Sequence, residues 1–265
     1  MIVQKNLTAA TKGLNQAIER LTTGFKLNHA KDNPANYAIL KSLESKLSSW
    51  NVAEDNISIG NCMLETAESN AELIGNHLMR IRDLCEQAAN GTYGEDSVRA
   101  IKGEISARAE EIVRIKDHAE FNGIKLFGHY DSEGNVIPKN INLQIGIDGS
   151  ESSRMTVDTS MNLRGINQID EWDITNPACL DALDDMLFTV SAYQTRIGSA
   201  QNRLECALEL AEVNQNRMTA TISTIRDADI AQVSSDYVKY QILQQACATL
   251  LATANQMPAI ALQLI

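Results

Sequence analysis

Residues 64–89 read LETAESNAELIGNHLMRIRDLCEQAA, and this stretch decides the fold. Its apolar residues recur alternately three and four positions apart, at Leu64, Ala67, Ala71, Ile74, Leu78, Ile81, Cys85 and Ala88. Such spacing puts one narrow apolar stripe along an α-helix, and a stripe of that width is best buried against another helix with the same repeat. The stretch therefore predicts one helix of a coiled coil.

The same repeat begins well before residue 64. Asn33 suits the N-cap of a helix and Pro34 its first position, so we expect the helix to begin here. Only Glu54 and Gly60 interrupt the apolar alternation that follows. A continuous helix from Pro34 to Asn90 would be about 85 Å long at the standard rise per residue. An element of that length is typical of a rod.

The rest of the chain supplies partners for this helix. A second series of heptads spans 183–225, and a shorter helical pattern covers 98–119. Within about 120–175 the period changes from seven to two, which predicts a small β-hairpin, with alternating apolar residues at Ile141, Leu143, Ile145 and Ile147. The predicted fold class is mainly α: a long antiparallel coiled-coil helix bundle with a small β-hairpin region and paired terminal helices.

Both ends of the chain carry apolar repeats of their own. The first runs through Leu7, Leu14 and Leu21, and Gly24 follows where a helix end favours a left-handed residue. RDADIAQ, at 226–232, predicts a bend in which the aspartates cap a helix rather than form a catalytic pair. We expect residues 1–30 and 230–265 to form one domain of terminal helices, and residues 31–229 to form a rod domain.

The last segment, QILQQACATLLATANQMPAIALQLI at 241–265, contains no charged side chain, although the protein is 22% charged with a net charge of −11. One apolar stripe runs along this segment and the residues just before it, through Val238, Ile242, Leu243, Ala246, Leu250, Leu251, Ala254, Met257, Ala261 and Leu264. A helix surrounded by protein on several sides cannot tolerate unpaired charges. Self-assembly through this helix is one hypothesis, and an ordinary intramolecular helix pair is the other.

Composition excludes several classes of protein. A pI near 4.9 and the absence of a basic stripe argue against nucleic acid as a partner. Polar residues interrupt the uncharged tail too often for membrane insertion. MIVQKNLTAATKG lacks the apolar run of a signal peptide, so we expect none. The five cysteines form no C-x-x-C pair and are interpreted as small apolar residues on helices.

Motifs in both halves of the chain resemble those of bacterial flagellin, the subunit of the flagellar filament. They are NL at 6–7, AIERLTTGFKLNHAKDN at 17–33, NISIGNCMLETAESNAELIGNHLMRIRDLCEQAANGT at 56–92, AEFNGIKLF at 119–127, LQIGIDG at 143–149, RIGSAQNRLECAL at 196–208, TISTIRDADIA at 221–231 and the tail. The resemblance implies a secreted protein of the bacterial flagellum that serves motility. Paired terminal helices would line the filament core, and self-assembly would follow passage of the unfolded chain through a dedicated export channel.

The resemblance also implies partners. An export chaperone would hold the carboxy-terminal segment before secretion, and the filament cap and hook-junction proteins would contact the chain at the ends of the filament. Self-assembly and chaperone binding would rest on Leu7, Leu14, Leu21, Ile242, Leu243, Leu250, Leu251, Met257 and Leu264. Toll-like receptor 5 would recognise the segment LMRIRDLCEQAAN at 78–90 through Arg80 and Leu84, on the flank of the long helix, and Glu104 on the next helix.

Departures from the family pattern and two alternatives complete the sequence-based expectations. Only MIVQK precedes Asn6, the variable outer domains are absent, and five cysteines are unusual in this family. An enzyme is not expected, because the four histidines are scattered and no catalytic or cofactor motif occurs; we expect no catalytic residues, metal or cofactor. A secreted helical interaction protein that does not polymerise, such as a filament-junction or minor flagellin-like component, would use the same apolar repeats.

Overall fold

The long helix predicted from the heptads is present as α2 (Pro34–Ala89). Its beginning follows the prediction: the Asn36 amide donates to Asn33 Oδ1 at 3.1 Å, so that Asn33 caps the first turn. Every residue of the predicted apolar stripe is buried, and two further buried residues, Leu40 and Ile57, lie towards the beginning of the helix. The stripe consists of Leu64, Ala67, Ala71, Ile74, Leu78, Ile81, Cys85 and Ala88.

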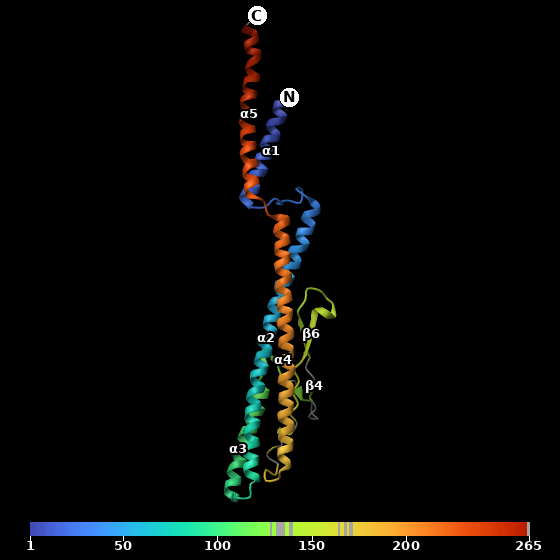
Figure 1. Cartoon of the computed structure of the whole chain (residues 1–265), viewed down its shortest axis with the longest axis vertical. Coiled ribbons are helices and arrows are strands. Elements are labelled where there is room, and N and C mark those ends of the chain that lie inside the picture. The colour runs from blue at the N-terminus through green and yellow to red at the C-terminus, as the bar shows by residue number, and fades with distance from the viewer. Residues whose placement is uncertain are drawn as a thin grey trace. The chain divides into compact units, whose positions relative to one another are not determined.

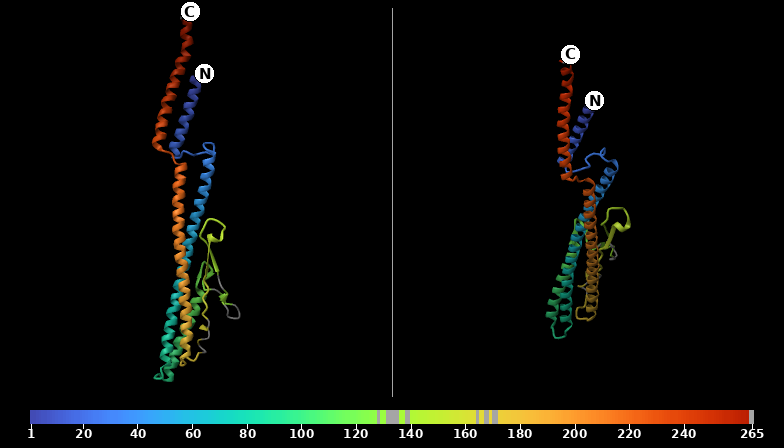
Figure 2. Two further views of the ribbon diagram at one scale, coloured as in Figure 1. Left: turned by 45° about the vertical axis from the view of Figure 1, so that its right-hand side comes forward. Right: turned by 45° about the horizontal axis from the view of Figure 1, so that its top comes forward.

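The structure is a computed structural model, shown in Figures 1 and 2. It describes residues 1–127, 129–130, 136–137, 140–163, 165–166, 169 and 172–263, with the backbone alone for 129–130, 136–137 and 255–263. The chain forms two compact units. The terminal unit consists of 1–48 and 215–265, and the central unit of 49–214; α2 and α4 (Ala178–Arg226) contribute to both. The terminal unit thus includes more of these two helices than the expected 1–30 and 230–265.

In the central unit α2 and α4 run side by side in opposite directions (Figure 2). Small residues on α2 set the distance between α2 and α4 at two positions along the pair. A Cβ added at Gly75 would lie 3.5 Å from Val190 Cγ1, and one added at Gly60 would lie 3.4 Å from Leu204 Cδ1. Gly60, which interrupts the heptads in the sequence, is therefore a point of close approach between the helices.

A third helix, α3 (Glu95–His118), completes the helical part of the central unit. Its N-cap is Gly94. Ile105, Ala109, Ile112 and Ile115 are buried in the core that α2 and α4 also line. In this core the rings of Phe127 and Tyr193 pack edge to face, with their centroids 5.4 Å apart.

The predicted β-hairpin is present. β5 (Asn140–Gln144) pairs antiparallel with β6 (Arg154–Asp158), and the short 3-10 helix η1 (Glu151–Ser153) lies between them. Two further antiparallel pairs precede the hairpin, each of very short strands: β1 (Glu120–Phe121) with β2 (Ile124–Lys125), and β3 (His129–Tyr130) with β4 (Val136–Ile137).

The hairpin is fixed to the helices through both of its strands. From β5, Leu143 Cδ1 would lie 3.0 Å from a Cβ at Gly60, and the Gln144 carbonyl accepts a hydrogen bond from Asn56 Nδ2 at 3.4 Å. From β6, Asp158 Oδ2 lies 3.1 Å from Arg196 Nη1 on α4. These contacts hold the hairpin against the α2–α4 pair.

In the terminal unit α1 (Ile2–Thr23) packs antiparallel against α5 (Ile230–Gln263), and the two views agree that they lie side by side (Figure 2). α1 ends as predicted, because Gly24 adopts a left-handed conformation with φ 75°. α4 ends and α5 begins at the predicted bend. There Asp229 Oδ1 accepts hydrogen bonds from the amides of Ala231 and Gln232, at 3.0 and 3.2 Å.

We use the name elbow for residues 24–33 and 227–229, which connect the terminal helices to α2 and α4. Two backbone hydrogen bonds tie its segments together, from Lys26 N to Arg226 O at 2.7 Å and from Ala228 N to Gly24 O at 2.8 Å. The guanidinium of Arg226 lies 4.1 Å from the centre of the Phe25 ring, and its Nη1 lies 3.1 Å from Glu44 Oε1.

The observed elements confirm the predicted fold class. Among the described residues, no helix is both long enough and apolar enough to cross a membrane.

Candidate self-assembly surface

Small residues bring α1 and α5 into close contact. Ala10 and Ala17 are each 4% exposed, and Gly13 lies between them on the same face of α1. A Cβ added at Gly13 would lie 2.6 Å from Cε1 of Tyr240, so the tyrosine ring occupies the space that a larger residue would need. Beside it, Gln244 Nε2 donates a hydrogen bond to Thr11 Oγ1 at 3.3 Å. One face of α5 is thereby covered by α1.

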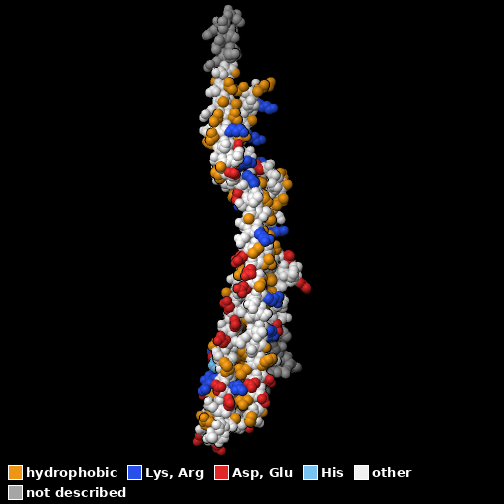
Figure 3. Space-filling model, viewed as in Figure 1, with side chains coloured by type: hydrophobic (Ala, Val, Ile, Leu, Met, Phe, Trp, Pro, Cys, Tyr) orange, Lys and Arg blue, Asp and Glu red, His pale blue; other side chains and the backbone are white. Residues whose placement is uncertain are grey.

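Much of the apolar stripe predicted on α5 remains exposed in the single chain. Ile242 is 59% exposed, Leu250 56% and Leu243 42%, and the preceding Val238 is 50% exposed. Val238, Ile242 and Leu243 line a hollow of about 660 Å³ together with Ser235 and Lys239. Figure 3 shows apolar side chains along the visible face of the terminal helices. From residue 241 onward the helix carries no charge, and exposed apolar side chains on such a segment mark a surface suited to contact with other protein.

Other residues of the predicted surface are half-buried, or their side chains are not described. Leu7, Leu14 and Leu21 are half-buried, because the alanines and the glycine of α1 take the positions closest to α5. Leu251 is also half-buried. Met257 lies in α5, but its side chain is outside the described part, and Leu264 lies outside the described residues altogether.

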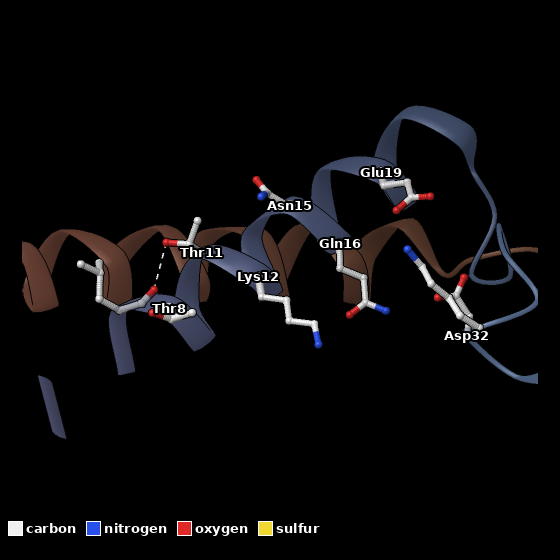
Figure 4. A pocket seen from close by; sticks show the side chains of 9 residues that line it. Thr8, Thr11, Lys12, Asn15, Gln16, Glu19 and Asp32 are labelled. Carbon is white, nitrogen blue, oxygen red and sulfur yellow. Dashed lines mark hydrogen bonds between the residues drawn. The ribbon is translucent and has the colours of Figure 1, made fainter. Parts of the chain in front are cut away.

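A polar groove of about 910 Å³ follows α1 on the side visible in Figure 4. It is lined by Leu7, Thr8, Thr11, Lys12, Asn15, Gln16, Glu19, Lys31 and Asp32. Backbone hydrogen bonds from His29 lower the pKa of Asp32, and the Asn28 amide adds to this effect. The Asp32 carboxylate therefore remains charged at neutral pH, so the groove combines polar and charged side chains of α1 with Lys31 and Asp32 of the elbow.

The three residues predicted to bind the receptor come together in the central unit, but they differ in exposure. Arg80 Nε lies 3.5 Å from Glu104 Oε1, and Arg108 Nη2 lies 2.9 Å from the same oxygen. Leu84 is only 2% exposed, so its expected position on the flank of the helix was wrong. The reason is that α3 covers this face of α2, with Ile105 in the same core.

The five cysteines also differ in their surroundings. Cys62 and Cys206 are exposed, whereas Cys85, Cys179 and Cys247 are buried. Burial matches the apolar role expected for the latter three. Burial is also the main cause that raises the pKa of Cys85 to about 12, and its neighbour Cys179 adds to the effect.

The elbow is the feature of the terminal unit that the sequence did not indicate. Lys41 Nζ lies 2.8 Å from Glu44 Oε2, and the hydrogen bond from Lys41 is the largest cause of the lowered pKa of Glu44. Glu44 in turn pairs with Arg226, which is far away in the sequence. No local pattern signals such a pairing. The only available signal was the aromatic Phe25 directly after the helix-ending Gly24.

Comparison with known proteins gives one consistent result for the chain. Residues 1–132 match the family model of the bacterial flagellin N-terminal helical region, and residues 180–265 match that of the C-terminal helical region. A flagellin of Halalkalibacterium halodurans is 32% identical over 279 aligned positions, which cover 100% of each chain.

Two solved structures share the fold. A Bacillus cereus flagellin, 24% identical, covers 59% of this chain and 88% of its own with a TM-score of 0.50. A Vibrio parahaemolyticus protein described as flagellar hook-associated, 17% identical, covers 74% of this chain and 100% of its own with a TM-score of 0.62.

The flagellin relative extends over the whole chain, and the family models match both helical ends, which in the structure pair with each other. The chain therefore belongs to the bacterial flagellin family, and it is an exported structural subunit that polymerises with itself into the flagellar filament.

Proposed function

We propose that the exposed apolar face of α5 is the main surface through which copies of this chain pack in the filament. The half-buried leucines of α1, Leu7, Leu14 and Leu21, would contribute its edge. The observation that carries the proposal is the exposure of Ile242 and Leu250, at 59% and 56%, on a segment without any charge. Full burial of a large aliphatic side chain stabilises by about 1.5–3 kcal/mol. A few such residues from each copy give association a sufficient driving force.

The absence of charge supports burial on more than one side. An exposed helix gains solubility from charged residues at almost no energetic cost, whereas a helix packed among several neighbours would have to desolvate each charge. α1 covers the face of α5 that carries Tyr240, Gln244 and Cys247, whereas Ile242 lies on the opposite face and Leu250 on the flank between the two. Neighbouring copies would cover this second face.

Two single substitutions test the assembly surface. Ile242→Glu and Leu250→Glu each place a charge on the exposed face without disturbing the contact between α1 and α5. We expect either variant to remain a folded monomer, with unchanged circular dichroism, and to stay in the supernatant when the wild type sediments as filaments. Ala107→Glu, at an exposed position on the already charged α3, is the matched control and should polymerise normally.

Polymerisation of Ile242→Glu and Leu250→Glu at the wild-type critical concentration would contradict the proposed surface. A wild-type chain that remains monomeric at every concentration, by sedimentation and negative-stain microscopy, would instead support a component that does not polymerise by itself.

The same face of α5 would bind the export chaperone before assembly. An uncharged amphipathic helix is a suitable ligand for an apolar groove, and a chaperone on this face would prevent premature polymerisation. The chain would travel unfolded through the export channel and meet the filament cap at the growing end and the hook-junction proteins at the other. If one face serves both roles, Ile242→Glu should weaken chaperone binding in calorimetry as well as polymerisation. Unchanged chaperone affinity would show that the chaperone uses another face.

Recognition by Toll-like receptor 5 is proposed for the central unit, at Arg80 and Glu104. Both side chains are accessible, at 44% and 40%, and their ion pair links α2 to α3 at a solvent-exposed position. Leu84, being buried, would support this surface from below. Arg80→Ala should lower receptor activation in a reporter assay, and Arg99→Ala, on an exposed part of α3, should not. Equal responses from both variants and the wild type would exclude this surface.

A structural role needs no chemistry, and we infer that the chain has no catalytic activity and no cofactor. Within the described residues, no group of three or more histidine, cysteine, aspartate or glutamate side chains is arranged to hold a metal ion. Turnover of any substrate that co-purifies with the filament would contradict this inference.

A further inference from the structure

Two of the five cysteines meet in the core of the central unit. Cys85, near the C-terminal end of α2, and Cys179, in the first turn of α4, are close enough that Cys179 adds to the rise in the pKa of Cys85. Both belong to the same buried cluster, with exposures of 0% and 7%. The Cys179 thiol also reaches the carbonyl of Ile174, with Sγ 3.9 Å from the oxygen, which fixes the side chain on the inner side of α4.

The register of the two helices leads independently to the same pairing. Towards the C-terminal end of α2, the contacts on α4 move stepwise towards its N-terminal end: first Gly60 with Leu204, then Gly75 with Val190. Further along α2, Arg82 Nε lies 2.6 Å from Asp184 Oδ1. One turn beyond Arg82 the same register brings Cys85 opposite the first turn of α4. The two thiols are thus held together by the packing of two long helices.

The other cysteines lack such a partner within the described residues. Cys62 and Cys206 are exposed on the outer faces of α2 and α4. Cys247 is buried in the terminal unit, on α5. The facing pair is therefore a specific feature of one position in the fold.

We propose that Cys85 and Cys179 form a disulfide bond that joins α2 to the first turn of α4, made as the central unit folds outside the cell in the presence of a small-molecule disulfide. In the first step, one cysteine thiolate attacks the small disulfide, which gives a mixed disulfide and releases one thiolate. The second cysteine thiolate then attacks the mixed disulfide and releases the other half. Two protein thiols are oxidised, one small disulfide is reduced to two thiols, and these take up the two protons.

The bond has to form before the core is fully closed. Burial raises the pKa of Cys85 to about 12, so that almost none of the folded protein carries this thiolate at pH 7. The completed core also excludes the oxidant. While the helices are coming together, both thiols are still solvated and already close, and exchange is fast. The helix register, rather than thiol reactivity, then selects this pair.

The bond would close a long loop of the chain that contains α3 and the hairpin β5–β6. A cross-link across a long loop removes conformational freedom from the unfolded chain and so favours the folded state. The central unit would become harder to unfold after export, while the reduced chain inside the cell would remain free of the cross-link.

Oxidative refolding of the full-length chain tests the proposal. The protein is unfolded in denaturant with a reductant, refolded in a mixture of oxidised and reduced glutathione, alkylated and digested for mass spectrometry. We expect the linked peptides of Cys85 and Cys179 to be the dominant disulfide product, while Cys62 and Cys206 are alkylated or carry glutathione. The Tm of the main unfolding transition should be about 10 °C higher than in the reduced protein, and it should fall back to the reduced value when reductant is added.

Two variants serve as a matched pair. Cys206→Ser should keep both the cross-link and the shift in Tm, whereas Cys179→Ser should lose both. Because Cys179→Ser could also fold poorly, the wild-type peptide map decides on its own. If Cys85 and Cys179 in the refolded, oxidised protein are alkylated as completely as Cys62 and Cys206, or are linked to other cysteines as often as to each other, the proposal is overturned.

Discussion

At the scale of single residues, the terminal unit contains a position, Gly13, where another side chain already fills the space of a Cβ. Gly13 faces the ring of Tyr240, and even a methyl group would approach three of the ring atoms to within 2.8 Å. Glycine in a helix normally destabilises it, since the unfolded chain loses more freedom on folding. Here the loss is offset by the close packing of α1 on α5, which a bulkier residue would prevent.

Gly13→Ala should therefore destabilise the terminal unit, despite the higher helix propensity of alanine. We expect a loss of about 1–3 kcal/mol from overpacking, seen as faster amide exchange in both α1 and α5. Gly198→Ala, at a helical site in α4 with nothing within 4 Å of the added Cβ, should instead stabilise its helix by about 0.5–1 kcal/mol. Equal effects of the two substitutions would mean that the tyrosine ring moves aside without cost.

Cys85 gives a second prediction at this scale, for the reduced protein at alkaline pH. Its pKa is raised from 9.0 to about 12 in the folded state, so its contribution to stability is fully present below pH 9 and is lost as the pH rises towards 12. Across that window the loss should approach about 1.4 kcal/mol per pH unit. Denaturant unfolding of the wild type and of Cys85→Ala, from pH 8 to 11, should show a difference that narrows as the pH rises. A difference that stays constant with pH would contradict the assigned titration.

The sequence predicted burial correctly for residues on the heptad stripe of α2, but not for Leu84 beside that stripe. The heptads correctly identified Leu78, Ile81 and Cys85 as buried, because a helix that packs against one partner buries one apolar stripe along its length. They placed Leu84 on the flank, because they cannot show that α3 packs on a second face of α2. The exposure of Leu84 depends on the position of α3, and the heptad spacing of α2 and α4 carries no information about that position.

At the scale of elements, the elbow decides how the terminal helices continue from α2 and α4. Its backbone hydrogen bonds join residues 24–26 to residues 226–228, and Arg226 contacts both Phe25 and Glu44. Local patterns predicted where α1 and α4 end and where α2 and α5 begin, since Gly24, Asn33, Pro34 and the aspartates act on their own neighbours. The pairing of two segments some 200 residues apart in sequence has no local signal, and it emerged only from the fold.

Arg226→Ala should loosen the elbow. Because this side chain is only partly buried, its ion pair and its contact with the Phe25 ring together contribute about 1–2 kcal/mol. We expect increased hydrogen–deuterium exchange at residues 24–33 and in the first turn of α5, with little change in the core of the central unit. Arg217→Ala, at an exposed position on the same helix, is the control. Increased exchange throughout 49–214 in the Arg226 variant would show that the arginine stabilises more than the elbow.

At the scale of the whole molecule, the ends and the middle of the chain differ in how they obtain stability. The central unit has a continuous buried core shared by three helices and a hairpin. In the terminal unit, α1 and α5 bury mainly small residues against each other and leave large aliphatic ones exposed. The sequence suggested this contrast through its uncharged tail, although residues alone left both an intramolecular pair and an assembly surface open.

Deleting Gln241 to Ile265 tests whether the central unit is stable without the terminal segment that serves assembly. The truncated chain should lose the ability to polymerise, because it lacks most of the exposed apolar face of α5. It should keep most of its helical circular dichroism, because α2, α3 and α4 do not depend on the deleted segment for their core. Sedimentation and far-ultraviolet spectra of the two chains provide the measurement. Loss of most of the helical signal would contradict an independent central unit.

The uncharged, apolar face of α5 has a consequence for temperature. Burial of apolar surface is driven by entropy near 25 °C and weakens on cooling, whereas contacts between charges depend mainly on ionic strength. If copies associate through Ile242, Leu243 and Leu250, filaments should shed subunits in the cold and regrow on warming, with little response to moderate amounts of sodium chloride. The apolar character of this one helix face would then make filament stability depend on temperature much more than on ionic strength.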